Sequence, residues 1–145
     1  MLEQWSYILN FLSYLGVTIP LVVLGALLFL LTTPYREIQL IKEGADASDS
    51  QAFHAAKAAA YDLGGKLLGL CLVLASAIYH SLGLVDLVIW GVIGAVFQVI
   101  IFYLFELITP FRIVSEIPNG NVSVGIFTSL LSISTGLLMA ALISY

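Results

Sequence analysis

Charged residues are scarce in this sequence. Asp, Glu, Lys and Arg together make up 10% of the 145 residues, whereas hydrophobic residues make up 61%. Soluble domains usually carry about 25% charged residues. The chain therefore has too few polar side chains to cover the surface of a water-soluble globule, and its composition is that of a membrane protein.

Cysteine pairs and catalytic motifs are also missing. Cys71 is the single cysteine, so no disulfide can form within the chain, and the two histidines, His54 and His80, lie far apart. The sequence has no H-E-x-x-H pattern, nucleophile elbow or phosphate-binding glycine loop. Its five basic residues form no patch suited to nucleic acid. We therefore expect no enzyme activity, no metal or cofactor, and no nucleic-acid partner.

What the chain does contain is four long apolar segments. They lie near residues 7–32, 52–80, 83–108 and 122–145. About 20 residues are enough to cross a bilayer core about 30 Å thick. Within lipid, helices satisfy the backbone polar groups of such segments, whereas open sheet edges do not. The sequence predicts an all-α polytopic protein with four transmembrane helices, which forms a single membrane domain over residues 1–145.

One motif occurs twice, each time directly after an apolar segment. The chain has TPYREIQLIKEG at 33–44 and TPFRIVSEIPNG at 109–120. This constant register predicts an internal duplication, with two-helix repeats over about 7–80 and about 83–145 that share one orientation. The matched residues of the motif are Thr33, Pro34, Tyr35, Arg36 and Gly44 in the first copy, and Thr109, Pro110, Phe111, Arg112 and Gly120 in the second.

The motif is typical of a helix end at a membrane surface. Proline disfavours helix in the residue before it, so helices should end near Thr33 and Thr109. The aromatic ring suits the headgroup layer, and the arginine lies just outside it. All five basic residues flank or lie in the two hairpins that contain the motif. The positive-inside rule therefore predicts cytoplasmic loops at 33–51 and 109–122, with both termini outside.

Charged and polar residues inside the apolar segments are the first candidates for a functional site. Asp62 and Lys66 lie one helical turn apart in the part of the second segment expected in the inner leaflet. They form either a local pair around a lysine that extends to the interface, or a proton or ion site together with Gln98. Glu106 lies near the inner boundary, and we expect it to pair with an arginine of the motif as an anchor.

Small residues recur on one face of three of the apolar segments. Such stripes allow helices to approach closely in lipid, both within a chain and between chains, so we expect a homo-oligomer. Whether the serines of the last stripe pack or line a pore is left open. The residues are Gly65, Gly69, Gly91, Gly94, Gly125, Ser129, Ser132 and Gly136.

Three stretches resemble a known family. TPYREIQLIKEG, LGGKLLGLCLVLASAIYHS and the third-segment stretch IWGVIGAVFQ are similar to the DUF 350 family (domain of unknown function 350). The resemblance covers roughly residues 10–145. It implies a small bacterial inner-membrane protein built from two copies of a two-helix unit. It also implies an uncharacterised family whose members sometimes accompany envelope-stress proteins, and it transfers no catalytic residue.

Two functional hypotheses follow. The first is a non-enzymatic oligomeric scaffold or envelope-stress component, whose basic cytoplasmic loops contact anionic membrane lipids or a peripheral cytoplasmic protein. The second is a small ion or solute channel or transporter with a polar site in the second segment. A wet path past Asp62 and Lys66 would favour the second hypothesis.

Overall fold

The structure, a computed structural model, describes residues 2–46 and 48–143, and within them the chain forms six helices and no strand. Four helices are long and apolar enough to cross a membrane, which confirms the predicted all-α class with four candidate spans. The helices are α1 (Leu2–Thr32), α2 (Glu37–Glu43), α3 (Ser50–His80), α4 (Leu84–Ile108), α5 (Ile113–Glu116) and α6 (Val122–Ile143).

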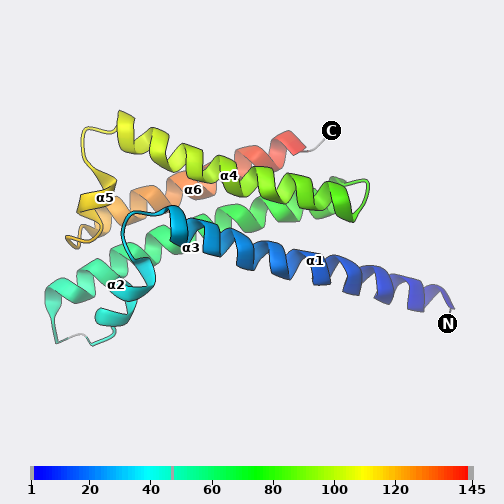
Figure 1. Cartoon of the computed structure of the whole chain (residues 1–145), viewed down its shortest axis with the longest axis horizontal. Coiled ribbons are helices and arrows are strands. Elements are labelled where there is room, and N and C mark those ends of the chain that lie inside the picture. The colour runs from blue at the N-terminus through cyan, green and yellow to red at the C-terminus, as the bar shows by residue number, and fades with distance from the viewer. Residues whose placement is uncertain (1, 47, 144–145) are drawn as a thin grey trace.

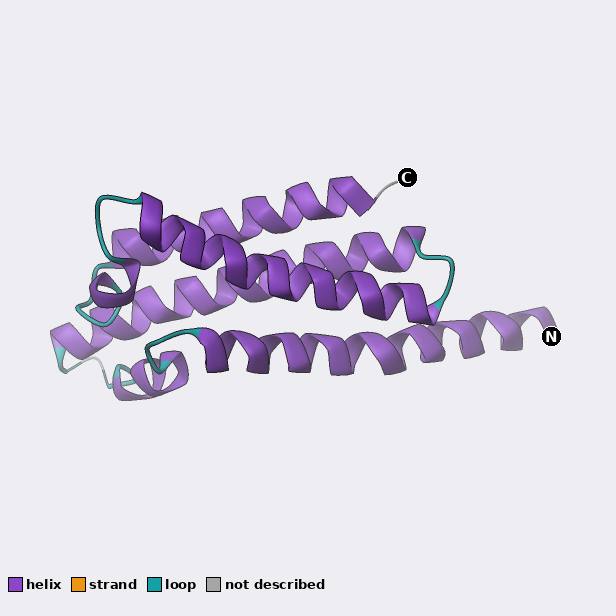
Figure 2. Ribbon diagram, turned by 45° about the horizontal axis from the view of Figure 1, so that its top comes forward, coloured by secondary structure: helices purple, strands orange, loops and turns teal. Residues whose placement is uncertain are grey.

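The four long helices form one bundle. Helices α1 and α4 run in one direction, and α3 and α6 return in the other (Figure 1). The short helices α2 and α5 lie together at one end, and the N-terminus and the end of α6 lie toward the other (Figures 1 and 2). Both hairpin loops therefore face the same side of a membrane. The duplication itself stays a prediction, and so do the boundaries of its repeats. The last two positions of the predicted second repeat, 144–145, lie outside the described residues.

The two copies of the motif end the first and third membrane helices in the same way. Helix α1 ends at Thr32 and α4 at Ile108, each directly before the Thr-Pro pair. The amide of Thr33 bonds to the carbonyl of Phe29, and that of Thr109 to Phe105, both at 2.9 Å. The expected ends near Thr33 and Thr109 are thus found. The short helix that follows each proline was not expected from the sequence.

The matched glycines of the motif serve different purposes. Gly120 has a φ of 84°, a left-handed conformation that side chains rarely adopt. Gly44 has an ordinary φ of −87°. A Cβ at Gly44 would instead collide with Ala56 and with the carbonyl of Ala52. The first glycine therefore lets α2 lie against α3, while the second makes the turn before α6.

Small residues lie where the long helices touch most closely. A Cβ at Gly65 would lie 2.5 Å from the hydroxyl oxygen of Ser129, whereas one at the adjacent Gly64 would meet nothing within 4 Å. Gly125 faces the backbone of Ala58 in the same way. The other glycines of the group are as tightly packed. Gly136 faces the backbone of Gly69, and Gly69 faces the carbonyl of Ser132. Gly91 packs against the side chain of Leu74, and Gly94 against that of Val73. These contacts all lie within one chain, along α3 and its neighbours.

The N-terminal end of α1 extends beyond the rest of the bundle (Figure 1). Trp5, Tyr7 and Phe11 are exposed by 63%, 73% and 62% of their surface. Such apolar exposure is suited to lipid or to a second copy of the chain.

Candidate functional site

A buried cluster of ionisable side chains lies where the connection after α1 meets the middle of α3. Glu37 and Asp62 are both 0% exposed, and Lys66 is 4% exposed. Glu37 begins α2, whereas Asp62 and Lys66 lie one turn apart on α3. We call Tyr35, Glu37, Asp62 and Lys66 the buried cluster.

Lys66 is the centre of the cluster. Its Nζ lies 2.6 Å from Asp62 Oδ2 and 2.8 Å from Glu37 Oε1. It also donates to Thr33 Oγ1 at 2.9 Å. A lysine ammonium has three donors, so every one of them has an acceptor here. Lys66 thus forms the expected local pair with Asp62, and its ammonium is enclosed by protein groups near the end of α1 instead of being exposed there.

Aromatic rings enclose the ammonium. Lys66 Nζ lies 4.4 Å from the ring centroid of Phe102 on α4, within the range of a cation–π contact. Tyr35 donates its hydroxyl to Asp62 Oδ2 at 2.7 Å. Burial raises the pKa of the Tyr35 hydroxyl above its usual value, so the hydroxyl keeps its proton and remains a hydrogen-bond donor. The cluster thus joins α3, α4 and the segment between α1 and α2.

The cluster contains two carboxyl groups but one ammonium. Burial raises the pKa of Glu37 to about 7, although the charge of Lys66 acts in the opposite direction. A hydrogen bond with Asp62 raises it further, because that bond favours the protonated form. Glu37 Oε2 and Asp62 Oδ1 are buried and accept no hydrogen bond from the described part of the chain. Near neutral pH the cluster can therefore bind or release one proton.

Gln98 of α4 lies near Lys66. Both residues line a cavity of about 10 Å³, roughly the room that one water molecule needs. Gln98 is 4% exposed, and neither its amide nitrogen nor its oxygen has a partner among the described residues. The structure thus brings Gln98 to the same small cavity as Lys66, without a direct hydrogen bond between them.

Glu106 lies outside the cluster. It is half-buried, and its Oε2 accepts a hydrogen bond from the backbone amide of Val114 at 3.2 Å. The expected ion pair with an arginine of the motif is not found among the residues that the structure describes. Glu106 instead anchors the start of α5 to the end of α4.

Comparison with known proteins gives the family. A family model described as Domain of Unknown Function (DUF350) matches residues 2–143. The chain belongs to the DUF350 family. This result confirms the resemblance drawn from the sequence, and no solved structure matches the chain significantly.

Two curated relatives of this DUF350 chain are membrane proteins. The UPF0719 transmembrane protein YshE of Bacillus subtilis (strain 168) is 32% identical over 130 residues, which is 89% of each chain. The UPF0719 inner membrane protein YjfL of Escherichia coli (strain K12) is 28% identical over 138 residues, 95% of this chain and 96% of the relative. With its four candidate spans, the DUF350 chain is a multi-pass inner-membrane protein.

Glu37 is the residue of the buried cluster that the sequence did not single out. The second copy of the motif has Ile113 at the matched position, and both residues are 0% exposed. Likewise, Phe111 stands at the position of Tyr35 and lacks the hydroxyl. The signal in the sequence was an acidic residue in one copy of the motif at the position where the other copy has isoleucine. The two copies of the motif therefore both follow the end of a membrane helix, and within the described residues the first copy alone contributes to the cluster.

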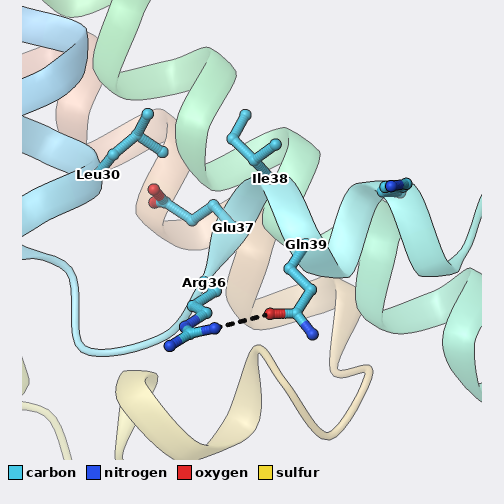
Figure 3. Close-up of a pocket in the computed structure, with 6 residues that line it drawn as sticks. Leu30, Arg36, Glu37, Ile38 and Gln39 are labelled. Atoms are coloured by element: carbon cyan, nitrogen blue, oxygen red, sulfur yellow. Dashed lines mark hydrogen bonds between the residues drawn. The ribbon is translucent and has the colours of Figure 1, made fainter.

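Glu37 also connects the cluster with the protein surface. It lines an open groove of about 470 Å³ between the end of α1 and α2, together with Leu30 and Arg36. Figure 3 shows the Glu37 carboxylate pointing away from Arg36 and Gln39, which are joined by a hydrogen bond at the outer edge. Glu37 thus separates the groove from Lys66.

Proposed function

We propose that this DUF350 chain is a non-enzymatic membrane transporter or channel for protons or small monovalent cations, with the buried cluster as its working site. The main support is the burial of Glu37, Asp62 and Lys66, which are 0%, 0% and 4% exposed in a bundle of membrane-spanning helices. Charged groups at membrane depth are costly and are typical of ion pathways and proton relays.

The competing explanation is a cluster that only holds the helices together. The second copy of the motif argues against it. There Ile113 packs with Ile117 and Val124 in an apolar core. Such packing avoids the desolvation penalty of several kcal/mol that each buried ion costs. Since apolar packing is available at this place in the fold, the charges in the first copy favour a functional role.

Proton binding gives the cluster two states. With Glu37 protonated, the charges of Asp62 and Lys66 cancel, and without that proton the cluster carries a net negative charge. The pKa of Glu37, raised by burial to about 7, places this change near neutral pH. A proton or small cation that enters from the groove would restore neutrality. Gln98 and its small cavity lie next to Lys66 and offer further polar atoms beside the cluster.

A flux measurement tests the proposal. In proteoliposomes with a pH gradient and an internal pH-sensitive dye, the parent chain is expected to dissipate the gradient. Glu37→Gln keeps the shape of the side chain but removes the titrating group, so it is expected to lose most of this flux. Glu43→Gln, the same change on the exposed part of α2, is the matched control and should retain it.

Two results would count against the proposal. One is a parent chain that moves neither protons nor monovalent cations. The other is a Glu37→Gln variant that conducts as well as Glu43→Gln.

We also propose that the two hairpin loops are cytoplasmic, on the strength of the positive-inside rule. Asp46 and Asn119 are exposed in these loops, and Leu82 is exposed in the opposite one. In a Cys71→Ala background, an impermeant thiol reagent added outside cells is expected to label Leu82→Cys and to spare Asp46→Cys and Asn119→Cys. The reverse pattern would invert the topology.

The scaffold and envelope-stress hypothesis stays a prediction, and so do the homo-oligomer and the peripheral protein partner. The small-residue stripes that suggested oligomers lie largely within the chain, at the contacts of Gly65, Gly125 and Gly136. The exposed half of α1 remains available for a second copy.

A further inference from the structure

The open groove beside α2 combines an apolar wall with positive charge. It has a volume of about 470 Å³ and lies between the last turn of α1 and α2. Leu30 and Ile38 provide apolar surface, and the guanidinium of Arg36 points away from both, toward Gln39 (Figure 3). Lys42, in the last turn of α2, adds a second positive charge.

The two cations are not neutralised within the described part of the chain. Arg36 donates to the Oε1 atom of Gln39 at 3.5 Å, and no ion pair joins Arg36 or Lys42 to an acid. Glu37, which is buried against Lys66, is the one acid among the residues that line the groove. Glu43 accepts from the neutral amide of Gln39 at 2.8 Å and keeps its negative charge, but it lies outside this lining. With Arg36 and Lys42, the lining therefore carries net positive charge.

The groove lies at the depth of lipid headgroups. Helix α1, a candidate span, ends at Thr32, and Leu30 lies in its last turn. The apolar wall is thus next to the hydrocarbon layer, and Arg36 and Lys42 lie where phosphates are found. A phospholipid carries its phosphate directly beside its acyl chains, which matches this arrangement. A free phosphate would leave Leu30 and Ile38 uncovered.

We propose that the groove binds one anionic phospholipid, with Arg36 and Lys42 holding the headgroup and Leu30 and Ile38 covering the first acyl carbons. This inference does not depend on transport by the buried cluster. Since Glu37 lines the same groove, a bound lipid would cover the surface entry to the cluster.

The second copy of the motif supplies a contrast within the same chain. Arg112 matches Arg36, but Pro118 stands at the position of Lys42, so the second cation is missing. Each copy also has an acid near the surface, Glu43 in the first and Glu116 in the second, so the contrast depends on the missing second cation. The second copy should therefore hold an anionic lipid less well, and Arg112 is a matched control at the same membrane surface.

Lipid titration with native mass spectrometry tests the proposal. The purified full chain in detergent is titrated with phosphatidylglycerol or phosphatidylcholine, and the occupancy of the first bound lipid is measured. We expect preferential binding of one phosphatidylglycerol per chain. Each basic side chain near an anionic lipid contributes about a fivefold change in affinity, so Arg36→Gln with Lys42→Gln should weaken binding about 25-fold. Arg112→Gln should leave the first binding step unchanged.

Thermal unfolding without added lipid verifies that all variants fold alike. If the double variant proves unstable, Lys42→Gln alone serves, because the exposed Lys42 side chain makes no ion pair within the described chain. Three outcomes overturn the proposal: equal binding of phosphatidylcholine, an equal loss in Arg112→Gln, or an unchanged double variant. Displacement of phosphatidylglycerol by equimolar inorganic phosphate would also overturn it, since it would indicate a free-anion site.

Discussion

Replacement of Lys66 by methionine is expected to destabilise the chain by about 3–5 kcal/mol, because it removes one partner of a buried ion cluster and leaves the others uncompensated. Lys66 lies within 2.8 Å of both Glu37 and Asp62, and both acids are 0% exposed. Thermal unfolding in detergent or nanodiscs measures the loss. Lys57→Met, the same change at an exposed position of α3, is the control and should have little effect.

A combined apolar variant separates stability from function. Tyr35→Phe and Glu37→Ile copy the second half of the chain, and Asp62→Leu with Lys66→Met removes the remaining charges. Replacement of a whole buried ion cluster by apolar groups is often neutral or stabilising, by up to about 4 kcal/mol. We expect this variant to recover the stability lost in Lys66→Met and to carry no proton flux. Full flux in such a variant would contradict the proposed function.

The four spans and the ends of two of them were predictable because their causes are local. Hydrophobic length identifies a membrane helix without knowledge of its neighbours. Proline acts on the residue before it, so Pro34 and Pro110 mark the ends of α1 and α4 wherever those helices pack. Asp62 and Lys66 could be paired for the same reason, since they lie one turn apart on one helix.

The rest of the cluster was not predictable, because it depends on how the chain returns on itself. Glu37 and Lys66 are 29 positions apart, and Thr33 and Lys66 are 33 apart. Helix α2 has seven residues, too few to give a clear hydrophobic period, yet it places Glu37 against α3. Comparison of the two motif copies was the one route from the sequence, since Glu37 stands opposite Ile113.

The free energy of unfolding of the parent chain is expected to fall as the pH rises from about 5 to about 8. Burial raises the pKa of Glu37 from 4.5 to about 7 in the folded chain. Between these two values the folded chain binds more protons than the unfolded chain, so stability decreases with increasing pH. A pKa shift of this size corresponds to about 3 kcal/mol of unfolding free energy. This contribution is present at a pH below the pKa of the unfolded chain and is lost at a pH above the pKa of the folded chain.

Glu37→Gln is expected to remove this dependence, because its neutral amide imitates the protonated acid at every pH. The other groups that face Glu37 are Asp62, Lys66 and the hydroxyl of Tyr35, and they remain in the variant. Glu43→Gln, on the exposed side of α2, should keep the slope of the parent. Unfolding free energies across the pH range decide the matter. Stability decreases with rising pH only where a group binds its proton more tightly in the folded chain than in the unfolded chain. A parent whose stability rises with pH, or a slope that survives in Glu37→Gln, would therefore show that Glu37 is not this proton-binding group.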